Sequence, residues 1–133
     1  MALETALVAP VLMALAVGGF DASQLVARQT ELQSAAAEAA AIVRATAPET
    51  SAERTTIGNI VATSTGVARA NVTVAEIYRC GTATDYVTTD TCGAGPKSTY
   101  IRVTIVDEKT PLWATFGIGG PVAYNVSRTV QIG

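Results

Sequence analysis

The chain begins with an apolar stretch and continues into a polar one in which apolar residues recur at helical spacing. Residues 5–20 carry no charge and lie between Glu4 and Asp21, and no strong helix breaker follows before Pro48. The pattern predicts one helix of roughly 45 residues, about 65 Å long at a rise of 1.5 Å per residue. Its first third is apolar on all sides, and its remainder is amphipathic.

The amphipathic part of this helix, residues 22–47, carries a narrow stripe of small and aliphatic side chains. Leu25, Leu32 and Ala39 stand at heptad spacing, with Gln29, Ala36 and Val43 beside them. Small side chains let helices approach one another closely, which is typical of helix–helix packing. A helix lying over its own sheet has a similar pattern. We therefore expect one face of this segment on the sheet and another face against further subunits.

Two further changes of pattern follow Pro48, which ends the long helix. Thr50 and Glu53 have the spacing of a capping box, and the apolar positions Ile57, Ile60 and Val61 predict a short second helix over about residues 51–64. From residue 70 the period becomes two, with many β-branched residues, in the segments 71–80, 98–108 and 122–132. These segments predict an antiparallel meander of three or four strands, and the fold class is α+β with the helix along one sheet face.

The strand alternation also predicts which side chains face inward. The inner positions are Val72, Val74, Ile101, Val103, Ile105, Val122, Tyr124 and Val126, followed by either Arg128 or Val130. The choice between these last two depends on whether a bulge shifts the alternation of the third strand.

Residues 5–20 approach the length of a membrane span, which usually needs about 17 to 25 apolar residues. Pro10 removes a helical hydrogen bond, so we expect a kink or a loosened turn near residues 6–10. A secretory signal peptide has an apolar core of similar length, but here an acid and no basic residue precedes the core. The other alternative is a helix buried in a soluble core.

The residues of the first third form a recognisable combination. ALETALVAPVLMALAVGGF, followed by ARQTELQSAAAEAA, contains a Glu after small residues, then A-L-V-x-P-x-L and A-R-Q-x-x-L-Q-x-A-A. The matching positions are Glu4, Ala6, Leu7, Val8, Pro10, Leu12, Ala27, Arg28, Gln29, Leu32, Ala35 and Ala36. This stretch resembles the TadE-like family, the minor pilins or pseudopilins of tight-adherence pili. Processed pilins usually carry the Glu at the fifth position, and here it is the fourth.

The resemblance implies a pilin-like fold in three parts. Residues 1–21 are the membrane and filament-core helix, residues 22–47 its amphipathic continuation, and residues 48–133 a globular extracytoplasmic domain. The side chains expected in the membrane or filament core are Leu7, Val8, Pro10, Leu12, Leu15, Val17 and Phe20. The expected role of Glu4 is to pair with a subunit N-terminus during assembly.

The resemblance also implies partners and a location. The partners are other minor and major pilins, the inner-membrane assembly platform, and a prepilin peptidase that removes the leader. The protein is expected in the inner membrane before assembly and in the pilus at the cell surface afterwards, where it would serve adhesion. The alternative is a bitopic inner-membrane protein with a periplasmic interaction domain that never polymerises. A soluble enzyme with an internal apolar helix is a third class.

Cys80 and Cys92 enclose a turn-rich loop of eleven residues, and the chain contains no His. Two thiolates without other ligands do not complete a tetrahedral zinc site. A disulfide is the natural interpretation for a domain beyond the membrane, where oxidation persists. Two free buried thiols in a cytosolic protein are the alternative.

The loop 109–121, KTPLWATFGIGGP, concentrates apolar side chains between Pro and Gly residues. It contains Leu112, Trp113, Phe116 and Ile118. These side chains either close the bottom of the core or form an apolar surface for a partner subunit or the membrane interface, where Trp is favoured. We expect contact with a partner subunit.

Composition and charge exclude several function classes. The net charge is −2 without a basic cluster, so nucleic acid is not an expected partner. No phosphate-binding Gly loop or G-x-S-x-G motif is present, so we expect neither an enzyme nor a cofactor. The loop acids Asp85, Asp90, Asp107 and Glu108 do not have the spacing of an EF-hand and are interpreted as solvated, not as a metal site.

Overall fold

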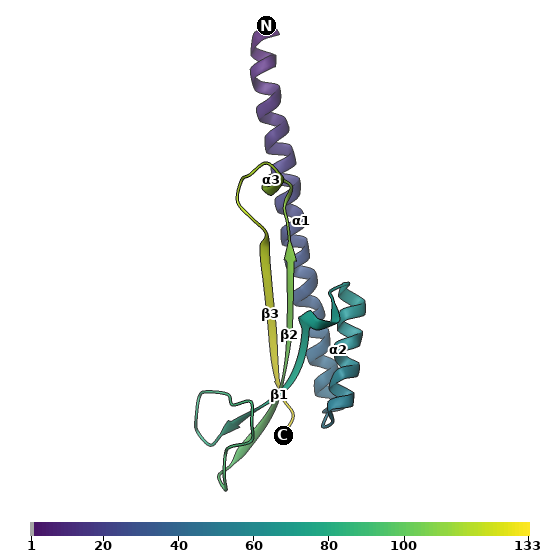
Figure 1. Cartoon of the computed structure of the whole chain (residues 1–133), viewed down its shortest axis with the longest axis vertical. Coiled ribbons are helices and arrows are strands. Elements are labelled where there is room, and N and C mark those ends of the chain that lie inside the picture. Colours follow the sequence, from purple (N-terminus) through teal and green to yellow (C-terminus); the bar gives the residue numbers. More distant parts are fainter. Residues whose placement is uncertain (1) are drawn as a thin grey trace. The chain divides into compact units, whose positions relative to one another are not determined.

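The computed structural model describes residues 2–133, and it has the α+β fold that the sequence predicts (Figure 1). A long helix is followed by a short one and by a three-stranded sheet of order β1-β2-β3. The elements are α1 (Ala2–Thr46), α2 (Ser51–Thr65), the 3₁₀ turn η1 (Arg69–Asn71), β1 (Val72–Cys80), β2 (Lys97–Lys109), α3 (Leu112–Thr115) and β3 (Val122–Gln131).

The chain forms two compact units that are discontinuous in sequence. The N-terminal unit joins the residues up to Thr30 with Glu108–Ala123, and the sheet unit joins Glu31–Asp107 with Tyr124–Gly133. Helix α1 begins in the first unit and ends in the second. The predicted division after residues 21 and 47 concerns the membrane and the exported domain, and it stays a prediction.

Helix α1 runs through Pro10 without interruption, so the loosened turn expected near residues 6–10 does not divide it. It ends at Thr46, where the Ala47 amide donates to the Val43 carbonyl at 2.8 Å. Ala47 has a left-handed φ of 41°, and Pro48 is fully buried. Pro48 therefore stops the helix, as predicted, because a proline disfavours the helical conformation of the residue before it.

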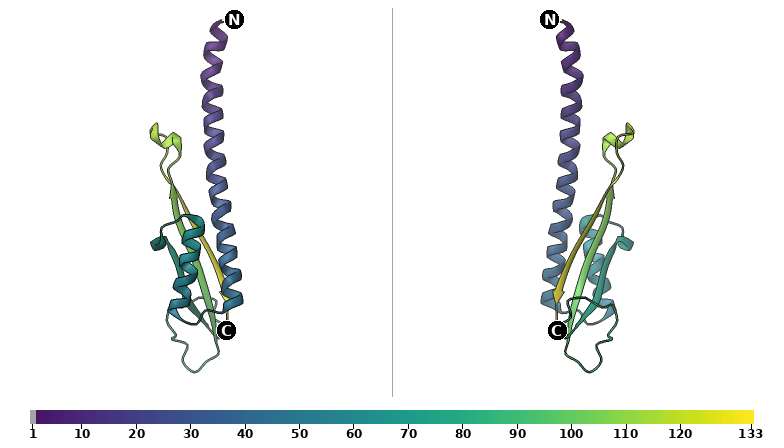
Figure 2. Two further views of the ribbon diagram at one scale, coloured as in Figure 1. Left: turned by 90° about the vertical axis from the view of Figure 1, so that its right-hand side faces the viewer. Right: turned by 90° about the vertical axis from the view of Figure 1, so that its left-hand side faces the viewer.

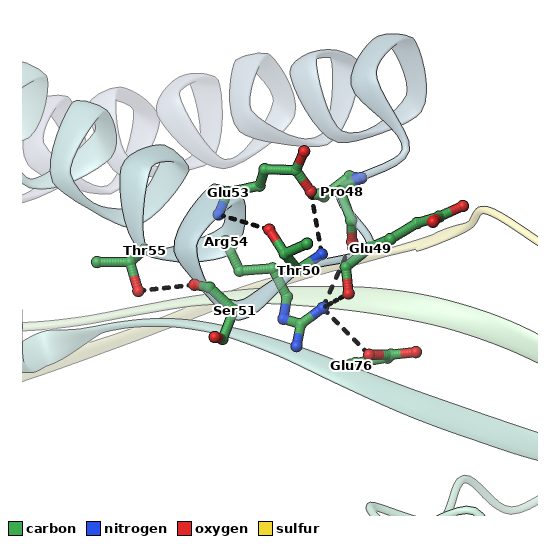
Figure 3. Close-up of polar contacts among 8 residues, drawn as sticks. All are labelled: Pro48, Glu49, Thr50, Ser51, Glu53, Arg54, Thr55 and Glu76. Carbon is green, nitrogen blue, oxygen red and sulfur yellow. Dashed lines mark hydrogen bonds and ion pairs between the residues drawn. The ribbon is translucent and has the colours of Figure 1, made fainter.

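Helix α2 has the predicted capping box at its start. The Glu53 amide donates to the Thr50 hydroxyl at 3.2 Å, and the Thr50 amide donates to the Glu53 carboxylate at 3.0 Å (Figure 3). Gly66 ends the helix with a left-handed φ of 67°. Arg54, in the first turn of the helix, forms an ion pair of 3.1 Å with Glu76 on β1. The first turn of α2 is thereby attached to the sheet.

One detail of the α2 prediction is wrong. Ile57 and Val61 are buried, but Ile60, which was assigned to the same apolar face, is 49% exposed. The inner face of α2 is completed instead by Gly58 and Thr65, both buried. A residue at i+3 lies near the edge of a helical stripe, so a narrow contact with the sheet leaves it in solvent.

The core of the sheet unit lies between the sheet and the two helices. Strands β1 and β2 are antiparallel, with Val72 opposite Ile105 and Val74 opposite Val103. Residues 31–46 of α1 and helix α2 lie side by side over one face of the sheet (Figures 1 and 2). The buried apolar side chains are Leu32, Ala36, Ala39, Val43, Ile57, Val61, Val67, Val72, Ile77, Ile101, Val103, Ile105, Tyr124, Val126 and Val130.

The alternation of buried and exposed residues along strand β3 is interrupted once, at Arg128. Tyr124, Val126 and Val130 are buried, whereas Arg128 is exposed. Of the two candidates for the last inner position, Val130 is therefore the one in the core.

One end of the opposite face of the sheet has a cover of its own, which the sequence did not predict. Ile77 pairs with Tyr100, one residue out of phase with the inner pairs, yet it is only 2% exposed. The Tyr86 ring meets the Tyr100 ring edge-on at a centroid distance of 5.1 Å, and the Arg102 guanidinium lies 5.2 Å from the Tyr86 centroid. The loop between Cys80 and Cys92 thus folds over this face, away from the helices (Figure 1).

Candidate membrane and assembly surface

The first half of α1 presents apolar side chains to its surroundings on every side. Leu7 is 71% exposed, and the other predicted side chains of this segment, Val8, Pro10, Leu12, Leu15, Val17 and Phe20, are exposed as well. Only 6% of the most apolar window of α1 is buried, and the helix is long and apolar enough to cross a membrane. The alternative of a helix hidden in a soluble core is therefore wrong.

Glu4 lies in the first turn of α1, with its side chain exposed. Thr5, Val8, Ala9 and Leu12 line a shallow groove together with it. A carboxylate in this turn lies at the positive end of the helix dipole, which favours its charge. Glu4 is thus a lone acid at the rim of an apolar surface.

The stripe predicted for helix packing divides between the two units. Leu32, Ala36, Ala39 and Val43 are at most 1% exposed and belong to the core of the sheet unit. Leu25 and Gln29 belong to the N-terminal unit and are partly exposed. The helix therefore packs the C-terminal part of the stripe against its own sheet, and Val26, outside the stripe, is exposed.

The predicted partner loop is a short helical turn, α3, between Pro111 and a pair of glycines. Phe116 is 78% exposed and Ile118 66% exposed, Leu112 is also exposed, and Trp113 is half-buried. Gly117 and Gly119 have positive φ values of 78° and 72°, conformations that side chains rarely adopt. The loop therefore turns its apolar side chains outward, and closing the core is not its main role.

Asp21 is the residue of this region that sequence reasoning missed. It is 5% exposed, and its carboxylate accepts a hydrogen bond from the Leu112 amide, the first amide of α3. Both residues belong to the N-terminal unit. The sequence signal was the position of Asp21 as the first charge after the apolar run, but its partner is 91 residues away.

Asp21 also lines a small apolar cavity of about 200 Å³. Ala14, Val17, Gly18 and Asp21 line it from α1, and Trp113, Phe116 and Ile118 line it from the loop. Gly18 and Gly19 have open space where a Cβ would stand. The loop and the end of the apolar helix segment therefore form one continuous apolar surface.

Cys80 and Cys92 form the predicted disulfide, with Cα atoms 5.1 Å apart. Asp90 of this loop pairs with the ammonium of Lys97, the first residue of β2, at 2.6 Å. Their hydrogen bond holds the pKa of the Asp90 carboxyl below its usual range and raises that of Lys97. Among the residues that the structure describes, no group of three or more His, Cys, Asp or Glu is placed to hold a metal ion.

Comparison with known proteins locates the similarity in the helix. The family model described as TadE-like protein matches residues 1–41. No curated protein and no solved structure matches the chain. The match covers the exposed apolar segment, Glu4, Asp21 and the first part of the buried stripe, and it ends before α2. The resemblance to the TadE-like family is thus confirmed, over residues 1–41 of this chain.

Proposed function

We propose that this protein is a structural subunit of a tight-adherence pilus, a minor pilin or pseudopilin that waits in the inner membrane and is then built into the filament. Residues 5–20 would span or enter the bilayer, and the sheet unit would lie outside the cytoplasm. The observation that carries this proposal is a TadE-like helix whose apolar first half is exposed while its second half is built into a folded domain. A helix of this kind needs an apolar environment that its own chain does not supply.

The disulfide supports the placement of the sheet unit. Structural disulfides form and persist in oxidising compartments such as the bacterial periplasm. The Cys80–Cys92 bridge fixes a loop over the outer face of the sheet. The disulfide is therefore consistent with a sheet unit that lies outside the cytoplasm.

Glu4 would act during assembly. An ionised carboxylate at the centre of a bilayer costs about 2.5 to 3.5 kcal/mol on insertion scales, and the cost is smaller near the surface. In the low dielectric of a filament core, an ammonium group is stable only when an opposite charge pairs with it. Glu4 would provide that charge for the N-terminal amine of a subunit, which would align subunits in register.

The remaining partners follow from the same proposal. A prepilin peptidase would remove the leader, the inner-membrane platform would extract the subunit, and other pilin-like subunits would pack against the exposed helix. The alternative is a bitopic membrane protein that never polymerises. Such an anchor has no use for an acid at the edge of its span, so Glu4 distinguishes the two.

The test replaces Glu4 by Ala and compares the variant with Glu38→Ala, which removes an exposed acid from the folded half of the same helix. Export, disulfide formation and membrane insertion should be unchanged in both. The Glu4→Ala subunit should be absent from sheared pili, whereas the Glu38→Ala subunit should be present at the wild-type level. Wild-type incorporation of Glu4→Ala would favour the bitopic anchor.

A further inference from the structure

We propose that the loop Pro111–Gly120 inserts into the lipid interface beside the helix and acts as a second membrane contact of the unassembled subunit. The inference rests on the proposed membrane anchoring and deepens it. It names the bilayer as the occupant of this surface, where the sequence left both a partner subunit and the membrane interface and favoured the subunit. The exposed Phe116 and Ile118 and the half-buried Trp113 form this contact.

The position of the loop along the helix is the first argument. On the helix side, Ala14, Val17 and Gly18 line the cavity together with Asp21. The first three lie in the last two turns of the charge-free run, and Asp21 is the first charge after it. A membrane-inserted helix passes from hydrocarbon to headgroups where its charges begin. The loop therefore lies at the depth where aromatic side chains are favoured at a bilayer surface.

The length of the apolar run is the second argument. Residues 5–20 extend about 24 Å at 1.5 Å per residue, whereas the hydrocarbon core of a bilayer is about 30 Å thick. A short span is normally accommodated by thinning the bilayer or by flanking residues. Here the apolar run is shorter than the hydrocarbon core, and the exposed apolar side chains of the loop add apolar surface at the end of the run that faces the folded domain.

The polar groups of the loop are the third argument, because a segment entering lipid must satisfy its own backbone. Residues 110–127 contain no charged side chain. The Leu112 amide donates to Asp21, and the amides of Ala114, Phe116, Gly117 and Ile118 donate to carbonyls within the loop. The hydrogen bond from the Leu112 amide also offsets the free-energy cost of burying the Asp21 carboxylate. The loop thus enters an apolar phase with these groups already paired.

Trp113 is the only tryptophan of the chain and serves as the probe. The full-length protein is reconstituted in phosphatidylethanolamine–phosphatidylglycerol vesicles whose lipids carry bromine either near the headgroup or near the chain end. Fluorescence of Trp113 should be quenched strongly by shallow bromine, weakly by deep bromine, and little by iodide in the aqueous phase. Phe116→Ser/Ile118→Ser should lose most of the shallow quenching, because it removes the two most exposed apolar side chains of the loop.

Two controls separate the possible failures. Ile60→Ser removes an exposed isoleucine far along the sequence and should leave the quenching unchanged. Met13→Trp in a Trp113→Phe background reports the span, and deep bromine should quench it. If this span probe is quenched but Trp113 is not, the helix is anchored and the loop inference is overturned. If neither probe is quenched, the proposed membrane function fails as well. Shielding of Trp113 only on addition of purified pilin subunits would assign the loop to a subunit contact instead.

Discussion

At the residue scale, single side chains cap the first turns of two helices. Thr50 and Glu53 cap α2, and Asp21 caps the first amide of α3. The first pair was predictable because a capping box is local and leaves a four-residue signature. The second was not predictable, because its partners are distant in sequence and come together only through the fold.

The capping box makes the stability of α2 depend on pH. Hydrogen bonds from the Thr50 amide and hydroxyl lower the pKa of Glu53 below its ordinary value. The contribution of Glu53 is therefore present above the ordinary pKa of a glutamate and is lost as the pH falls through the lowered folded value. Glu53→Gln keeps a hydrogen-bond acceptor without a charge. The stability of this variant should therefore fall less than that of the wild type as the pH is lowered from 7. Urea unfolding of both proteins across this range is the measurement, and identical pH slopes would contradict the prediction.

At the level of elements, the sheet is covered by helices on one face and by the disulfide loop at one end of the other face, and the sequence predicted only the first cover. The period of two placed Val72, Val103, Ile105 and Val126 on the helix side, because regular alternation is a strong signal for a half-buried strand. Ile77 falls out of phase with that pattern and would face solvent in a one-sided sheet. Its cross-strand neighbour Tyr100 is contacted by Tyr86 of the disulfide loop, whose fold has no periodic signal.

Opening the disulfide should therefore weaken the outer cover and spare the helix side. Closing a loop with a sequence separation of 12 stabilises by about 3 kcal/mol in the chain-entropy model. Cys80→Ser/Cys92→Ser should lower the free energy of unfolding by about this amount. It should also speed hydrogen exchange at Tyr78 of β1 and Val87 of the loop, whose amides each donate to the carbonyl of the other residue. Unchanged exchange at these two amides would show that the loop holds its place without the bridge.

At the level of the whole molecule, one helix serves two environments, and the same residue type has opposite roles in them. Leu32 is fully buried in the sheet unit, whereas Leu12 is 59% exposed on the apolar segment. The sequence identified both parts, since hydropathy and periodicity change between them. It did not predict the two discontinuous units, because the return of residues 108–123 to the N-terminal helix is a long-range contact.

Leucine truncation should separate the two roles. Leu32→Ala leaves a cavity in a close-packed core and should cost about 3 kcal/mol of unfolding free energy. Leu12→Ala should leave that free energy unchanged, because the Leu12 side chain is exposed and is not part of the core. Urea unfolding in detergent measures both, and membrane fractionation provides the second readout. An equal loss in both variants would mean that the apolar segment is part of the same cooperative unit.

The division into units also determines how a pulling force on helix α1 would pass through the chain. The chain crosses between the N-terminal unit and the sheet unit three times, at residues 30–31, 107–108 and 123–124. Only the crossing at residues 30–31 lies in helix α1, because the other two are the ends of segment 108–123, which is attached to the helix by the Asp21–Leu112 hydrogen bond and by apolar contacts. In the proposed pilus, tension on the helix would therefore pass along the covalent chain at residues 30–31, and the non-covalent contacts of segment 108–123 would take part of the load.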